Sequence, residues 1–135
     1  MDAQQIKTAQ DHMEPDFISQ AFRIGDMVIT SGQAAISPAG ELVGVGDFDA
    51  QAEQVFANLA EVLEAAGSSL AKVVKVTIYL TDMSQFPKVM ALRERYFSAP
   101  YPADTIVVVA SLALPELEIE IEATALIGGK TVAAS

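Results

Sequence analysis

The amino-acid sequence predicts a single α+β domain in which two helices cover one face of a sheet. Two stretches repeat apolar residues at three- and four-residue spacing, as an amphipathic helix requires. Other stretches alternate apolar and polar residues or are continuously apolar, as strands are. The 135 residues suffice for one hydrophobic core, and no linker or repeat divides them. Residues 1–135 are therefore expected to form one unit.

The beginning of the chain is predicted to hold one hairpin between irregular segments. Residues 1–18 lack a pattern, and the first 16 of them are expected to form a polar arm. Ser19–Ile24 and Met27–Ser31 are strand-like and flank Gly25-Asp26, a pair that suits a tight hairpin because glycine comes first. A short extended piece is expected at Leu42–Val45, after a turn.

The strongest pattern predicts a helix from Asp49 to Ala66. Asp47 or Asp49 can cap its start, and Gly67 suits the left-handed position just past its end. A second helix is expected from Gln85 to Phe97, with Ser84 as its cap.

Three later stretches are predicted to be strands of the same sheet. Val73–Leu80 and Leu117–Ile127 alternate apolar and polar residues, whereas Thr105–Leu112 is apolar on both faces. Two helices can cover only one face of such a sheet. We therefore expect another copy of the chain to cover the second face, with Ile106–Val109 against a neighbouring subunit.

Composition excludes several classes of function. A net charge of −10 with only eight Lys and Arg disfavours nucleic acids and anionic membrane surfaces. No apolar stretch is long enough to span a bilayer, and the first residues lack the features of a signal peptide, so a cytoplasmic protein is expected. The chain has no cysteine, and its one histidine, His12, lies in the polar arm, where it is expected to be solvated. Neither a metal nor a cofactor is expected.

Two short motifs allow both a structural and a functional interpretation. Ser31-Gly32-Gln33 ends a predicted strand, where the glycine either relieves a tight bend or lets a ligand approach backbone N–H groups. Glu118, Glu120 and Glu122 lie on one face of the last predicted strand, which by default is a solvated face. Each motif alone is weak evidence for a functional site.

Taken together and in order, several segments resemble the RidA/YjgF/UK114 family, over roughly residues 16 to 127. The segments that carry the resemblance are residues 29–33 (ITSGQ), 58–59 (NL), 63–70 (LEAAGSSL), 73–77 (VVKVT), 81–86 (TDMSQF), 96–97 (YF), 102–103 (PA) and 119–123 (IEIEA).

The resemblance implies a chorismate-mutase-like subunit, with a single mixed sheet, in a homotrimer that binds small molecules in three clefts between subunits. Family members with the full site hydrolyse reactive enamines and imines, such as 2-aminoacrylate, to keto acids and ammonia. In them an Arg after the Pro-Ala pair clamps the substrate carboxylate, the Ser-Gly-Gln turn holds the substrate, and a Glu on the last strand handles the hydrolytic water. Ser31, Gly32 and Glu120 match these positions.

The sequence departs from the family's pattern at two positions. Asp104 follows Pro102-Ala103 where the Arg is expected, and Ile18, beside Phe17, stands near the family's Tyr. Loss of a charge-assisted hydrogen-bond pair costs about 1.5–3 kcal/mol, or roughly ten- to a hundredfold in affinity. Efficient 2-aminoacrylate hydrolysis is therefore not expected. Alternatively, Asp104 marks a decayed cleft, or simply caps a turn beside Pro102.

The leading hypothesis is a divergent hydrolase or deaminase acting on a small imine, enamine or related metabolite. Glu120 would be the acid/base, coupled to Asp104 in the same cleft, while Ser31, Gly32, Phe17, Ile18 and Ile106 would bind the ligand. The alternative is a trimer that binds or senses a small molecule without converting it. A third function attached to this family, ribonuclease action, is disfavoured by the net charge.

Overall fold

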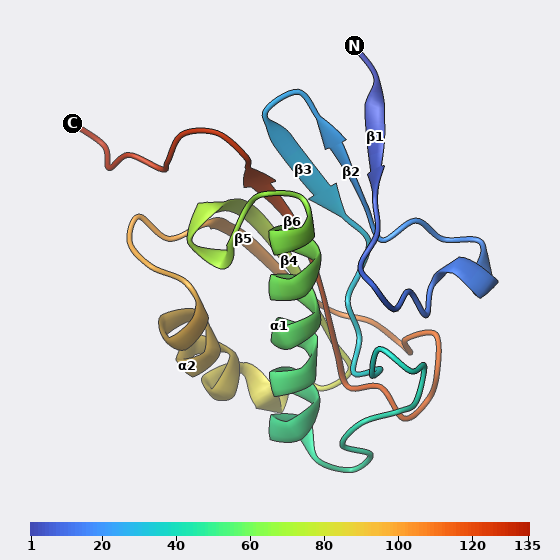
Figure 1. Cartoon of the computed structure of the whole chain (residues 1–135). Coiled ribbons are helices and arrows are strands. Elements are labelled where there is room, and N and C mark those ends of the chain that lie inside the picture. Colours follow the sequence, from blue (N-terminus) through green and yellow to red (C-terminus); the bar gives the residue numbers. More distant parts are fainter.

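A single six-stranded sheet forms the centre of the computed structural model, which describes residues 1–135, and both α-helices lie against one face of it (Figure 1). The strands are ordered β1-β2-β3-β6-β4-β5, and only β4 and β5 are parallel. This arrangement confirms the predicted α+β class with one mixed sheet. The elements are β1 (Ala3–Ile6), β2 (Ala21–Ile24), β3 (Met27–Thr30), α1 (Phe48–Ala65), β4 (Val73–Leu80), α2 (Phe86–Tyr96), β5 (Ala103–Val108) and β6 (Ile119–Leu126).

Helix α1 begins and ends as its sequence predicts. The side chain of Asp47, rather than that of Asp49, accepts a hydrogen bond from the backbone N–H of Ala50 at 3.1 Å. At the other end Gly67 has φ +84°, and its N–H and that of Ser68 donate to carbonyls of the last turn. The apolar side of the helix, including Phe56, is fully buried against the sheet.

Helix α2 is one residue shorter than predicted at each end. Asp82, not Ser84, caps the turn before it: the Asp82 carboxylate accepts from the Ser84 N–H at 2.9 Å, at the start of a short 3-10 helix (Met83–Gln85). Tyr96, at the end of α2, stacks on Phe56 of α1 with ring centroids 4.1 Å apart. Neither α1 nor α2 is long and apolar enough to cross a membrane.

The hairpin at Gly25-Asp26 is confirmed, but the arm before it is not irregular throughout. Strands β2 and β3 pair antiparallel on either side of Gly25, which has φ +58°. Residues 3–6, predicted to be part of an unpatterned arm, form β1 and add a strand to β2 at the edge of the sheet. Backbone hydrogen bonds hold this strand, and its side chains are mostly exposed, so hydrophobic periodicity gave no signal for it.

Two other strand predictions need correction. The strand expected at Thr105–Leu112 is β5, which begins at Ala103 and ends at Val108. Its start includes Asp104, which therefore belongs to a strand and caps no turn. The extended piece expected at Leu42–Val45 is a loop with one isolated bridge, between Ile36 and Leu42.

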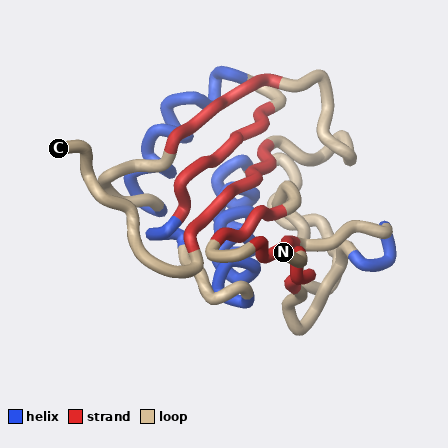
Figure 2. The backbone as a smooth tube through the Cα atoms, turned by 90° about the horizontal axis from the view of Figure 1, so that it is seen from above, coloured by secondary structure: helices blue, strands red, loops and turns tan.

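The register of the sheet decides which side chains share a face. Asp104 of β5 pairs with Val76 of β4, which is fully buried beneath the helices. Glu120 of β6 pairs with Tyr79 of β4, which is three residues after Val76 and therefore points to the opposite face of the sheet. Because neighbouring residues of a strand point to opposite faces, Asp104 faces the helices and Glu120 faces the open side of the sheet. Figure 2 shows the sheet with its helices on one side only.

Candidate functional site

The carboxylate of Glu120 lies directly against the backbone of Gly32. A side-chain Cβ placed on Gly32 would come within 2.6 Å of the Glu120 Oε2 atom and 2.8 Å of its Cδ atom. The backbone N–H of Gly32 has no hydrogen-bond partner within the chain. The missing side chain of Gly32 therefore makes room for the Glu120 carboxylate beside a free N–H donor, and the approach of a ligand to that N–H stays a prediction.

The turn that carries Gly32 is fixed on both sides. The hydroxyl of Ser31 donates to the carbonyl of Ser19 at 2.5 Å, and the Ser31 N–H donates to the carbonyl of Gln20 at 2.9 Å. The N–H and carbonyl of Gln33 exchange hydrogen bonds with Ile121, next to Glu120, at 2.7 and 3.0 Å. The hydroxyl of Ser31 is thus engaged in holding the turn, and Gly32 is held in register with Glu120.

A cavity of about 420 Å³ contains both Gly32 and Glu120. Ile18 also lines it, and apolar side chains from residues 113–117 form much of its wall. We call this the Glu120 cavity. His12 also lines it, although the sequence predicted a solvated histidine with no role. No sequence signal pointed to His12, because the arm reaches the cavity only after folding back on the sheet.

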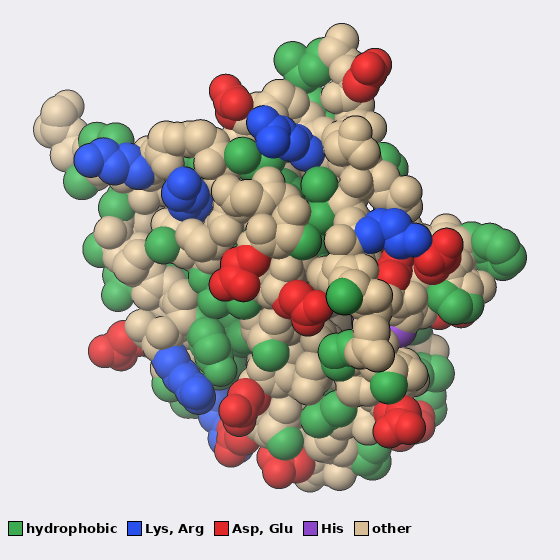
Figure 3. Space-filling model, in the orientation of Figure 1, with side chains coloured by type: hydrophobic (Ala, Val, Ile, Leu, Met, Phe, Trp, Pro, Cys, Tyr) green, Lys and Arg blue, Asp and Glu red, His purple; other side chains and the backbone are tan.

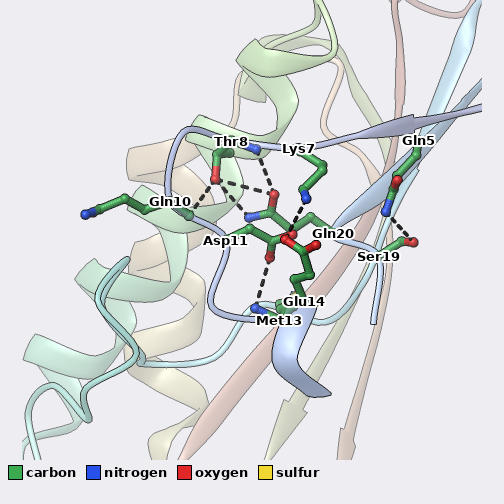
Figure 4. A network of polar contacts seen from close by, with 9 residues as sticks. All are labelled: Gln5, Lys7, Thr8, Gln10, Asp11, Met13, Glu14, Ser19 and Gln20. Carbon is green, nitrogen blue, oxygen red and sulfur yellow. Dashed lines mark hydrogen bonds and ion pairs between the residues drawn. The ribbon is translucent and has the colours of Figure 1, made fainter. Parts of the chain in front are cut away.

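A network of polar contacts holds the folded-back arm in place (Figure 4). The side-chain amide of Gln20 accepts from the Thr8 N–H at 2.8 Å and donates to the Thr8 hydroxyl at 3.0 Å. Lys7 pairs with Glu14 at 2.6 Å, and the Asp11 carboxylate accepts from the Met13 N–H at 2.9 Å. These contacts position His12 and Ile18 on the wall of the Glu120 cavity.

The pKa of Glu120 is raised above its usual value. Burial of the carboxylate is the main cause, and the negative charge of nearby Glu122 adds to it. Glu122 in turn accepts a short hydrogen bond from the hydroxyl of Tyr79, which lies opposite Glu120 on β4, and this bond raises the pKa of Tyr79. Glu120 is therefore a stronger base than an ordinary surface carboxylate, the property that a general acid/base needs.

Phe17 and Ser31 lie beside the Glu120 cavity rather than in it. Both line a second hollow of about 350 Å³, which shares Ile18 with the Glu120 cavity. Phe17 is 98% exposed and has φ +62°, a left-handed backbone conformation that few residues other than glycine adopt. An exposed aromatic side chain held out in this way is available to a partner.

Asp104 and Ile106 lie elsewhere, in a cavity of about 520 Å³ between α2 and β5. The carboxylate of Asp104 accepts two hydrogen bonds from Arg93 of α2, from Nε at 2.8 Å and Nη2 at 2.7 Å. Only 26% of the Arg93 side chain and 18% of the Asp104 side chain are exposed. We call this space the Arg93 cavity.

Asp104 and Glu120 therefore do not form a carboxylate pair within one chain. They lie on opposite faces of the sheet, and the raised pKa of Glu120 comes from burial and Glu122, not from Asp104. The charge of Asp104 is instead neutralised by Arg93 of α2. A meeting of Asp104 with Glu120 in one cleft requires two chains and stays a prediction. No group of three or more His, Cys, Asp or Glu side chains lies close enough to hold a metal ion.

The fold and the site define a small α+β protein with a glutamate on its last strand packed against a Ser-Gly-Gln turn. The family model described as Endoribonuclease L-PSP matches residues 15–127. The chain belongs to this family, the RidA/YjgF/UK114 family, as its sequence motifs predicted.

Relatives and solved structures agree with this assignment. The chain is 44% identical over 108 residues to a RutC family protein of Pyrococcus horikoshii, covering 79% of this chain and 84% of the relative. It is 39% identical over 109 residues to the 2-iminobutanoate/2-iminopropanoate deaminase of Salmonella typhimurium, covering 78% and 84%. The crystal structure of RidA from an Antarctic Psychrobacter matches with a TM-score of 0.83 and 40% identity, covering 92% of this chain and 99% of that one.

Proposed function

We propose that this protein is an imine- or enamine-hydrolysing deaminase whose active sites are clefts between the subunits of a homotrimer. The observation that carries the proposal is the half-buried Glu120 carboxylate, with its raised pKa, packed against Gly32 and its free N–H in a cavity. The Salmonella relative named as an imine deaminase supports the reaction class.

The geometry of Glu120 suits hydrolysis of a C=N bond. Water attacks the imine carbon, and the Glu120 carboxylate takes a proton from it. Glu120 passes this proton to the nitrogen, which gives a carbinolamine. Glu120 then takes the proton of the new hydroxyl group and delivers it to the amine, so that the C=O bond forms as the C–N bond breaks and ammonia leaves. Positioned acid/base groups of this kind contribute about 10²–10⁴-fold to rate. The free N–H of Gly32 would hold an acceptor atom of the substrate beside the carboxylate.

A second chain would complete the cleft. The Glu120 cavity and the Arg93 cavity are each open, and the edge strand β5 leaves Val107 and Val108 exposed. Phe17 is also fully exposed beside the Glu120 cavity. Joining the Glu120 cavity of one subunit to the Arg93 cavity of the next would bury these apolar side chains and enclose a ligand.

The experiment is to generate 2-iminobutanoate and an uncharged imine in solution and to measure formation of the carbonyl product with the wild-type protein and with Glu120→Gln. We expect catalysis by the wild-type protein and a loss of about 10²-fold or more in Glu120→Gln. Binding of a ligand that is never consumed would contradict the proposal and favour the alternative of a non-catalytic binding or sensing trimer.

A further inference from the structure

The guanidinium of Arg93 is held in one orientation by contacts on two sides. Asp104 receives hydrogen bonds from the Nε and Nη2 atoms, so it occupies one edge of the planar group. The ring of Phe86 lies across one face, with its centroid 5.6 Å from the Arg93 Cζ atom. Such a two-point, fork-shaped contact fixes direction as well as charge, which a lysine could not do.

The opposite edge of the guanidinium is unoccupied. A guanidinium carries five N–H groups, and Arg93 uses two of them for Asp104 and makes no other hydrogen bond. Three N–H groups therefore remain, including both on Nη1. Arg93 lines a cavity of about 520 Å³ whose other walls include Met90, Phe97 and Ile106. Oriented donors at the side of a mainly apolar cavity are the usual pattern of a small-molecule site.

The charge of Arg93 is already balanced. A ligand carboxylate would meet Asp104 and, at the rim, Glu94, in a chain whose net charge is −10. Repulsion from these groups offsets the attraction of the guanidinium for a carboxylate. An uncharged carbonyl oxygen accepts the same N–H groups without that repulsion.

We infer that Arg93, held by Asp104, orients the substrate, and that the Arg93 cavity takes small uncharged carbonyl or imine compounds with an apolar body rather than α-carboxylates. Arg93 thus supplies the donor group of the cleft from α2, and Asp104 is its positioning residue. The inference deepens the proposed function, since it names the substrate class of the same cleft, but it concerns binding and not the chemical step.

The test compares two unreactive probes that differ only at one end: 2-oxobutanamide and 2-oxobutanoate. Their dissociation constants are measured by calorimetry for the full-length wild-type protein, Arg93→Gln, Arg93→Lys and Asp104→Asn. Arg95→Gln is the matched control, because Arg95 lies on the same helix and contacts Tyr96 but does not line the cavity.

We expect the wild-type protein to bind the amide about tenfold more tightly than the carboxylate. Arg93→Gln should weaken amide binding by about tenfold or more. Arg93→Lys should restore only part of this affinity, because an ammonium group lacks the planar, forked N–H donors of a guanidinium. Asp104→Asn should strengthen carboxylate binding about tenfold and weaken amide binding severalfold, because Asn can accept only one of the two hydrogen bonds that orient Arg93. Arg95→Gln should change neither constant.

A purely structural role for the ion pair would lower the stability of these variants but would leave the ratio of the two dissociation constants unchanged. That result would overturn the inference, as would tighter binding of the carboxylate by the wild-type protein or no binding of the amide at millimolar concentration. Failure of the proposed function is distinguishable, because it would appear as absent turnover in the wild-type protein while the preference for the amide remains.

Discussion

At the scale of single residues, the account depends on the contact between Gly32 and Glu120. Two segments that are 88 positions apart in the sequence meet here because Gln33 bridges to Ile121, and the absence of a side chain at position 32 lets the carboxylate rest on the backbone. The sequence indicated both residues by resemblance. It could not indicate that the hydroxyl of Ser31 donates a hydrogen bond to the carbonyl of Ser19, because this contact follows from how β2 and β3 pair.

Gly32→Ala should abolish most activity while leaving the fold intact. The added Cβ would lie 2.6 Å from the Glu120 Oε2 atom, and the end of a flexible side chain can rotate away at low cost to stability. We expect a loss of activity of about tenfold or more, because the general acid/base is displaced, with little change in melting temperature. Gly128→Ala is the control, since a Cβ there would meet only Asp26 at 3.9 Å. Full activity in Gly32→Ala would refute the contact's role.

Glu120→Gln should change how stability depends on pH. The folded-state pKa of Glu120 is raised from 4.5 by burial and by Glu122, so the folded protein binds more protons than the unfolded chain in this range. Its stability therefore falls as pH rises from about 4.5 through the raised pKa. Glutamine does not ionise, so the Glu120→Gln variant does not lose this stability as pH rises. Thermal melting between about pH 5 and pH 8 should show Glu120→Gln gaining stability over the wild-type protein as pH rises; a difference that shrinks with pH would contradict the shift.

At the scale of secondary-structure elements, the sequence predicted those helices and strands whose apolar periodicity and turn residues determine their position. Helix α1 was located within one residue at each end because apolar spacing, Asp47 and Gly67 all agree. Strand β1 was not predicted, because backbone hydrogen bonds hold it and its side chains are mostly polar or exposed. The pairing of Arg93 with Asp104 was not predicted either. It depends on where β5 begins: because the strand starts at Ala103, the side chain of Asp104 points toward α2.

The Arg93–Asp104 pair should join α2 to β5 more strongly than a surface ion pair does. A double-mutant cycle with Arg93→Gln and Asp104→Asn should give a coupling energy of about 1–2 kcal/mol, since both side chains are mostly buried and share two hydrogen bonds. Lys88–Asp49, whose side chains are 50% and 74% exposed, serves as the comparison and should couple by less than about 0.5 kcal/mol. Equal coupling energies in chemical denaturation would argue against the orientation proposed for Arg93.

At the scale of the whole molecule, the net charge of −10 disfavours RNA binding, despite the description of the family model as an endoribonuclease. Figure 3 shows basic side chains dispersed over this face of the molecule rather than gathered in one patch. Of the three basic residues on α2, Arg93 is paired with Asp104 and Lys88 with Asp49. We expect no binding or cleavage of RNA at physiological salt. Saturable, salt-sensitive binding in a filter assay would show that a basic surface forms on assembly.

The two faces of the sheet carry different parts of the proposed cleft. Glu120, Glu122 and Tyr79 lie on the open face, while Asp104 and Arg93 lie on the helix side. The assembled particle is expected to have about three times the 14.3 kDa mass of the chain. In such a trimer each cleft would take its acid/base from one subunit and its orienting guanidinium from the next.

Combining two impaired variants in one trimer tests this division of the cleft most directly. Glu120→Gln and Arg93→Gln are coexpressed with different tags, and mixed trimers are isolated through both tags. Their imine hydrolysis, at a substrate concentration below saturation, is compared with that of each variant purified alone. If each cleft combines Glu120 of one subunit with Arg93 of its neighbour, every mixed trimer contains one intact cleft out of three, and activity should return to about a third of that of the wild type. Mixed trimers no more active than the more active parent would contradict the shared cleft.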